Sequence, residues 1–126
     1  MSITFDDVLT WIRDFAGTVA ANKAYLTELD SAIGDADHGI NMDRGFQAVT
    51  GKLDTLASSD IGGCLRTIGS TLVSTVGGAS GPLYGMFFMQ MGGAVAGKES
   101  LTLEEFAGAF ETGLGGVLRI LSLIHI

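Results

Sequence analysis

The chain has 126 residues, which is enough for one domain with a single core. Fourteen acidic against seven basic side chains give a formal net charge of −7, which argues against nucleic-acid binding. The single cysteine, Cys64, can form no internal disulfide, and the first residues lack the basic and apolar segments of a signal peptide. We therefore expect a cytoplasmic protein that does not bind nucleic acid.

Hydrophobic residues at helical spacing predict three helices in the first half of the chain. Thr4 and Asp7 have the spacing of a capping box, and apolar residues then recur from Phe5 to Val19. A shorter second helix is predicted around residues 25–29, followed by a loop. A third helix is predicted from about residue 40 to 53.

Three more helices are predicted in the second half. Asp60 is the expected N-cap of the fourth, and Pro82 suits the first turn of the fifth because its missing N–H needs no partner there. Thr102 and Glu105 repeat the capping-box spacing and open the sixth. No strand pattern is visible, so we predict an all-α chain of about six helices that pack largely antiparallel.

Glycine is abundant inside the apolar segments of the chain. Nineteen glycines against one proline indicate helices that pack closely, or backbone that approaches a ligand. The uncharged stretch 67–97 raises the question of a membrane span, but its glycine-rich middle would leave backbone groups unpaired in hydrocarbon. We therefore expect buried core helices and no membrane hairpin.

An acidic segment, "LDSAIGDADHG" at residues 29–39, is the first candidate site. Asp30, Asp35 and Asp37 would repel one another unless a cation lies among them, and oxygen ligands suit a hard ion such as Mg²⁺. The alternative is a helix end followed by a solvated Asp-rich turn. A calcium-binding EF-hand is excluded, because Phe46 stands where that loop needs a bidentate acid.

The second candidate site is the glycine-rich segment "GGASGP", residues 77–82. Successive backbone N–H groups here can converge on an anion, and the following helix adds the positive end of its dipole. The alternative is a tight turn between helices. Together, the acidic and glycine-rich segments indicate a site for a nucleotide diphosphate or triphosphate with Mg²⁺, and thus phosphoryl transfer.

A third segment has the glycine and lysine spacing of a phosphate-binding motif. Residues 92–98, "GGAVAGK", match the spacing of a P-loop, but Glu99 stands where that loop needs Ser or Thr and no strand precedes it. We interpret it as a helix C-terminus with Gly97 as the cap and Lys98 near the negative end of the dipole.

Two longer segments carry a resemblance to a known family. "LDSAIGDADHGINMDRGF" and "STVGGASGPLYGMFF" closely resemble the L subunit of dihydroxyacetone kinase, a nucleotide-binding domain that also occurs in ATP-dependent dihydroxyacetone kinases. The resemblance extends from about Trp11 to Val117. It implies an antiparallel eight-helix barrel, of which this chain would contain about six helices, with some apolar faces left exposed.

The resemblance also assigns roles to individual residues. Asp30, Asp35 and Asp37 would hold two Mg²⁺ ions that bridge the phosphates of ADP or ATP. The residues implied to approach the nucleotide or its phosphates are His38, Gly39, Ile40, Asn41, Gly77, Gly78, Ala79 and Ser80. No catalytic residue independent of this site is implied.

The resemblance further implies partner proteins. In the phosphotransferase-system type, a phosphohistidine on an M subunit regenerates ATP from bound ADP, and the ATP phosphorylates dihydroxyacetone held on a K subunit. We expect this type, with phosphoenolpyruvate as the ultimate donor. An ATP-dependent kinase domain and a nucleotide-dependent regulatory module, which would bind a transcriptional regulator, are the alternatives. The sequence does not determine the oligomeric state, and a homodimer is one state that it allows.

The chain departs from the family after about Val117. Its last six residues, "LSLIHI", are what the common transposon-adapter sequence CTGTCTCTTATACACATC encodes. We therefore expect residues 1–120 to be a partial helical-barrel domain and residues 121–126 to be a non-native tail. The expectation is that the chain alone binds Mg-ADP weakly or not at all and is inactive as an enzyme.

Overall fold

The computed structural model describes residues 2–31, 38–53, 56, 60–76 and 80–124. Within these ranges it contains five helices and two short strands. The elements in chain order are β1 (Ser2–Thr4), α1 (Phe5–Ser31), α2 (His38–Leu53), α3 (Ile61–Thr75), α4 (Ser80–Ala94), β2 (Ser100–Thr102) and α5 (Leu103–Ile124). The prediction of an all-α fold is therefore confirmed.

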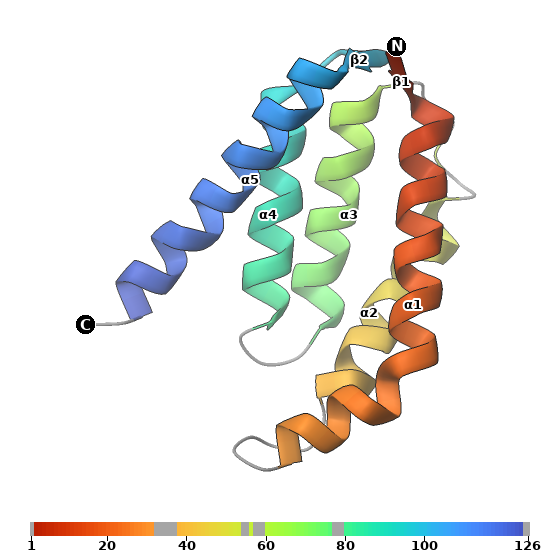
Figure 1. Cartoon of the computed structure of the whole chain (residues 1–126), viewed down its shortest axis with the longest axis vertical. Coiled ribbons are helices and arrows are strands. Elements are labelled where there is room, and N and C mark those ends of the chain that lie inside the picture. The colour runs from red at the N-terminus through yellow and green to blue at the C-terminus, as the bar shows by residue number, and fades with distance from the viewer. Residues whose placement is uncertain (1, 32–37, 54–55, 57–59, 77–79, 125–126) are drawn as a thin grey trace.

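Consecutive helices run in opposite directions, as predicted, and each packs mainly against its neighbours in chain order (Figure 1). The core between them is built from apolar side chains of all five helices, including Ile12, Phe46, Leu72, Met91 and Ala109. Trp11 connects α1 to the C-terminal half of the chain, because its ring contacts Phe88 of α4 and Phe106 of α5.

The structure corrects two predictions of secondary structure. The expected first and second helices form one continuous helix, α1. Residues 20–24, "AANKA", link the two apolar segments and contain neither glycine nor proline, so nothing interrupts the helix. Two strands also form where none was expected, and each is too short for an alternating pattern to be recognised.

The two strands join the beginnings of α1 and α5. β1 and β2 are antiparallel, with Ser2 opposite Thr102 and Thr4 opposite Ser100. Both predicted capping boxes are present directly after them: the Thr4 hydroxyl accepts from the Asp7 N–H, and the Thr102 hydroxyl accepts from the Glu105 N–H. The N-termini of α1 and α5 are thereby fixed at the same end of the molecule.

The remaining helix-end predictions are mostly confirmed. Gly97 follows α4 with a φ of +79°, a conformation that favours glycine, and the 92–98 segment is therefore a helix end rather than a P-loop. Asp60 is the N-cap of α3, but its side chain does not bond to the first turn. Instead, its Oδ1 accepts from the backbone N–H of Gly97 at 3.1 Å, which connects α3 to the end of α4.

Candidate functional site

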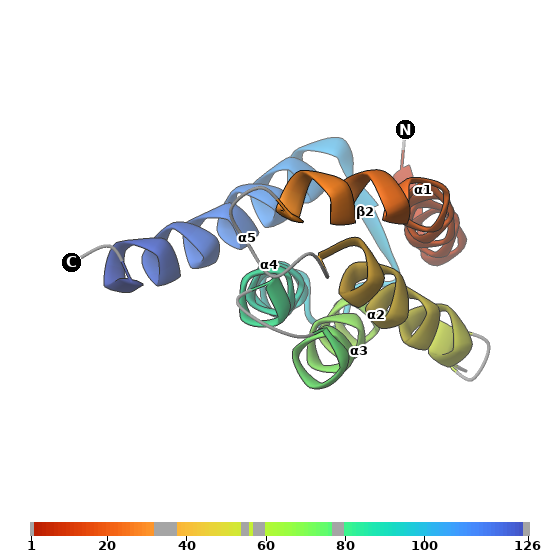
Figure 2. The ribbon, with the colours of Figure 1, turned by 90° about the horizontal axis from the view of Figure 1, so that it is seen from below.

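The two motifs identified in the sequence flank helix ends that lie at one end of the molecule. α1 ends and α2 begins on either side of the acidic segment, while α3 ends and α4 begins on either side of the glycine-rich segment. All four ends lie at the side opposite the strands (Figure 1), and Figure 2 shows α2 between α1 and α3 when this side is viewed directly. The helix ends that flank the two motifs are about 40 residues apart in the sequence, and they lie at the same end of the molecule.

Several predicted site residues lie outside the described part of the structure. These are Asp35, Asp37, Gly77, Gly78 and Ala79. Asp30, His38 and Ser80 belong to described helices, at the end of α1 and the first positions of α2 and α4, but their side chains lie outside the described part. Their assigned roles as metal or nucleotide ligands remain predictions.

Gly39 lies in the contact between α1 and α2. A Cβ atom built at this position would overlap the backbone carbonyl of Lys23 and lie 2.7 Å from the Thr27 hydroxyl oxygen, so only glycine allows this approach. The same two helices are joined by an ion pair between the Lys23 ammonium and the Asp43 carboxylate, 3.6 Å apart. Helix packing accounts for Gly39, which fixes the beginning of α2 on α1.

Asn41 is half-buried at the beginning of α2 and is held by a neighbouring arginine. The Nη2 group of Arg44 donates to the Asn41 Oδ1 at 2.7 Å, and the Arg44 Nε donates to the Thr75 backbone carbonyl at 3.1 Å. Ile40, the remaining described residue of the predicted set, is 53% exposed. The sequence did not predict a role for Arg44. Its position one helical turn after Asn41 would have indicated that the two side chains can contact each other.

No metal cluster is present in the described ranges, and these ranges exclude Asp35 and Asp37. Cys64 was interpreted as buried and inert, and the structure confirms that it is buried. Burial, with a smaller contribution from the negative charge of Asp60, raises the pKa of the Cys64 thiol to about 11. The thiol is therefore protonated at neutral pH and is a poor nucleophile.

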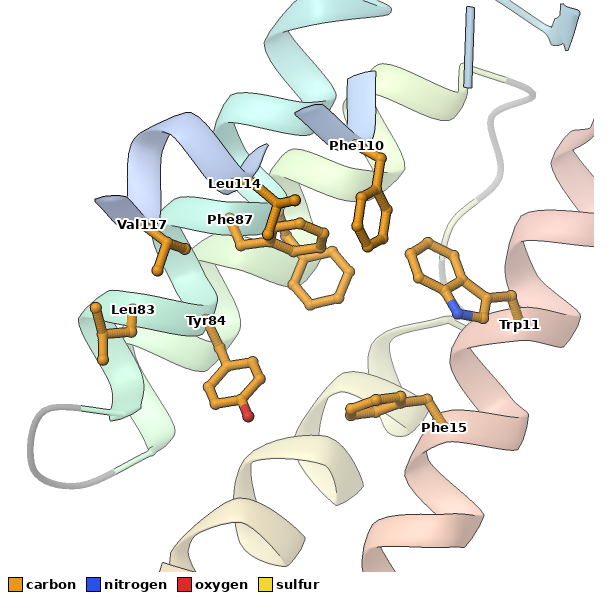
Figure 3. Close-up of a pocket in the computed structure, with 9 residues that line it drawn as sticks. Trp11, Phe15, Leu83, Tyr84, Phe87, Phe110, Leu114 and Val117 are labelled. Carbon is orange, nitrogen blue, oxygen red and sulfur yellow. The ribbon is translucent and has the colours of Figure 1, made fainter. Parts of the chain in front are cut away.

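An apolar groove of about 520 Å³ lies between α1, α4 and α5. Figure 3 shows Trp11 and Phe15 of α1 facing Tyr84 and Phe87 of α4 and Phe110 of α5 across it. The described residues that line it are Trp11, Phe15, Leu83, Tyr84, Phe87, Phe88, Phe110, Leu114 and Val117. Because the described residues of its lining include no charged group, this groove does not suit phosphates or a divalent metal.

Among the described helices, none is long and apolar enough to cross a membrane.

Comparison with known proteins relates the chain to nucleotide-binding subunits. The ADP-binding subunit DhaL of PEP-dependent dihydroxyacetone kinase from Escherichia coli is 46% identical over 118 residues, covering 94% of this chain and 56% of that protein. The ADP-binding subunit DhaL of PEP-dependent dihydroxyacetone kinase 1 from Listeria innocua serovar 6a is 43% identical over 117 residues, covering 93% of this chain and 59% of that protein. The chain thus spans about half the length of the curated relatives it matches.

The family comparison gives the same result. Residues 32–122 match the DAK2 domain, a range that contains Asp35, Asp37 and the whole glycine-rich segment. More than half of the chain is therefore matched, and its all-α fold agrees with this domain. The chain belongs to the DAK2 domain family.

Proposed function

We propose that this chain is the nucleotide-binding part of a dihydroxyacetone kinase. The observation that carries the proposal is the 46% identity with an ADP-binding subunit over 94% of this chain, an alignment that includes both motifs. The arrangement of the helix ends supports it, because the flanks of both motifs meet at one end of the molecule. The bound nucleotide would be ADP or ATP, and the protein would work in the cytoplasm.

The residues available for Mg²⁺ fit that ion. Asp30, Asp35 and Asp37 offer carboxylate oxygens, the ligands that Mg²⁺ prefers, and no lysine or arginine lies between Lys23 and Arg44 to neutralise them. We assign these three aspartates to two Mg²⁺ ions. The metal would neutralise the charge of the phosphates, which explains how a chain of net charge −7 binds a polyanion.

The protein's own groups would bind and orient the phosphates. His38 is the first residue of α2 and Ser80 the first of α4, so both stand at the positive end of a helix dipole. Backbone N–H groups of residues 38–41 and 77–80, with the Ser80 hydroxyl, would donate to phosphate oxygens. This positions the transferred group and stabilises its charge, which is most of what catalysis of phosphoryl transfer requires.

The relatives' names favour a relay from phosphoenolpyruvate. The two DhaL subunits above are described as parts of PEP-dependent kinases, and the subunit from Lactococcus lactis as part of a PTS-dependent one. The L-erythrulose 1-kinase from Mycolicibacterium smegmatis is 26% identical over 118 residues. From the names of the DhaL relatives we propose two partners, a K subunit that holds dihydroxyacetone and an M subunit that carries phosphohistidine. Separately, we propose that residues 1–120 are the native domain.

A reconstituted reaction tests this proposal. Because the chain spans about half the length of its relatives, the assay uses a chimera of residues 1–117 and the remaining sequence of the Escherichia coli relative. With K and M subunits and phosphoenolpyruvate, we expect dihydroxyacetone phosphate to form in the presence of the chimera and much less with the chain alone. Asp35→Asn should abolish product formation, whereas Asp14→Asn, which makes the same charge change on an exposed part of α1, should not.

Other outcomes would redirect the proposal. Product formation from ATP without the M subunit would identify an ATP-dependent kinase. Absence of product with either donor, together with ADP-dependent retention of a transcription factor, would favour the regulatory module. An active Asp35→Asn chimera would contradict the metal assignment.

A further inference from the structure

Arg44 connects the two helix ends that flank the proposed nucleotide site. Its Nε donates to the backbone carbonyl of Thr75 at 3.1 Å, and its Nη2 donates to the Asn41 Oδ1 at 2.7 Å. Thr75 is the last residue of α3, so its carbonyl has no partner within that helix. One guanidinium therefore satisfies the end of α3 and holds a side chain at the beginning of α2.

The contact with Arg44 determines which end of the Asn41 amide remains available. An amide has an oxygen that accepts and an NH₂ group that donates, whereas a guanidinium can only donate. The Asn41 oxygen must therefore face Arg44. The NH₂ group can then only donate, so a ligand that it binds has to offer an acceptor such as a phosphate oxygen.

A second contact between α2 and α3 does not depend on Arg44. A Cβ atom built at Gly45 would overlap the side chain of Val76 and approach that of Leu72, so the two helices touch closely at this glycine. Val76 and Leu72 are both buried in the core. The helices should therefore stay packed when Arg44 is replaced, which makes an Arg44 variant informative.

We propose that Arg44 is a positioning residue for nucleotide binding. It keeps Asn41 oriented as a hydrogen-bond donor to phosphate, and it fixes the end of α3 from which the glycine-rich segment continues. This inference rests on the proposed function, because it requires a phosphate-containing ligand at these helix ends. Arg44 acts through Asn41 and Thr75 and is not itself assigned to the reacting atoms.

A double-mutant cycle on the full chain tests the proposal. Binding of ADP with Mg²⁺ is followed by NMR titration, which measures weak affinities, for the unmodified chain, Arg44→Gln, Asn41→Ala and the double variant. We expect each single replacement to weaken binding about tenfold. The double variant should be weaker than Asn41→Ala by about threefold or less, because Arg44 acts largely through Asn41.

A matched control separates positioning from general stability. Arg119 of α5 also donates across a helix contact, from its Nη2 to the Gln90 Oε1 at 3.4 Å, and lies outside the proposed site. Arg119→Gln should change the ADP affinity less than about twofold. An Arg44→Gln variant that binds like the unmodified chain, or effects that multiply to about a hundredfold in the double variant, would overturn the proposal.

A second readout needs no nucleotide. In the unmodified chain, the Asn41 side-chain NH₂ should give two distinct proton signals, and the Arg44 Nε–H should exchange slowly with water. Arg44→Gln should make the Asn41 side-chain NH₂ signals broaden and shift toward those of a solvent-exposed asparagine. Unchanged Asn41 signals would overturn the positioning role even if ADP binds, whereas failure of the chimera used for the activity assay to bind Mg-ADP would count against the proposed function alone.

Discussion

At the scale of residues, Glu105 fixes the N-terminus of α5. Glu105 accepts from the Thr102 N–H at 2.9 Å and is paired with the Lys98 ammonium. The hydrogen bond from Lys98, followed by that from the Thr102 N–H, lowers the pKa of the Glu105 carboxyl. The sequence predicted the capping box from its spacing, but not the pair with Lys98, because that contact depends on how the chain turns after Gly97.

The lowered pKa of Glu105 predicts a pH-dependent stability. Because the unfolded chain binds the proton more tightly, Glu105 contributes stability above its ordinary pKa, and the contribution is lost as the pH falls through the lower folded-state value. Urea unfolding should therefore show Glu105→Gln less stable than the unmodified chain at pH 7, with the difference shrinking below about pH 5. Lys98→Gln should reproduce this profile, and a difference that is constant with pH would contradict the assignment.

At the scale of elements, glycines allow α3 and α4 to pack with their backbones in contact. A Cβ atom at Gly69 would lie 2.6 Å from the carbonyl oxygen of Gly85, and one at Gly62 would lie 2.7 Å from that of Gly92. The sequence predicted close packing from the number of glycines in apolar segments. It could not show which glycines face each other, because that depends on the register between two helices.

A pair of glycine replacements tests this packing. Gly69→Ala should lower the free energy of unfolding by roughly 1–3 kcal/mol, because the added methyl group meets the backbone of α4. Gly17→Ala should raise it by about 0.5–1 kcal/mol, because Gly17 is inside α1 with nothing within 4 Å of the added atom. Urea denaturation measures both values, and two changes of the same sign would contradict the packing as described.

The helix boundaries show the limits of pattern reading at this scale. Thr4, Asp60 and Thr102 begin helices as predicted, since capping depends on a few neighbouring residues. The predicted division of α1 into two helices is wrong, because no residue between the two apolar segments breaks a helix. The pairing of β1 with β2 joins segments about 98 residues apart in sequence, which no local pattern reveals.

At the scale of the whole molecule, the predicted exposure of apolar faces is confirmed in the described part. Leu114 and Leu118 of α5 are 45% and 64% exposed, and the apolar groove opens between α5 and α1. α5 extends to Ile124 without a change in secondary structure at the proposed boundary after residue 120. That boundary remains a prediction.

The candidate site was only partly predictable at this scale. The residue types of the two motifs indicated Mg²⁺ and phosphate, because their chemistry is local. The bond from Arg44 to Thr75 could not be predicted, since it depends on the end of α3 lying beside the beginning of α2. Gly39 was assigned to the nucleotide, and the structure shows that its contact with α1 also requires glycine.

Calorimetric titration of ADP with and without Mg²⁺ tests the central claim most directly. The account predicts that the chimera used for the activity assay binds ADP only with Mg²⁺, and that the chain alone binds more weakly. Asp35→Asn should weaken binding by about tenfold or more, while Asp14→Asn leaves it unchanged. ADP binding that is independent of both Mg²⁺ and Asp35, or no ADP binding by the chimera, would contradict the account.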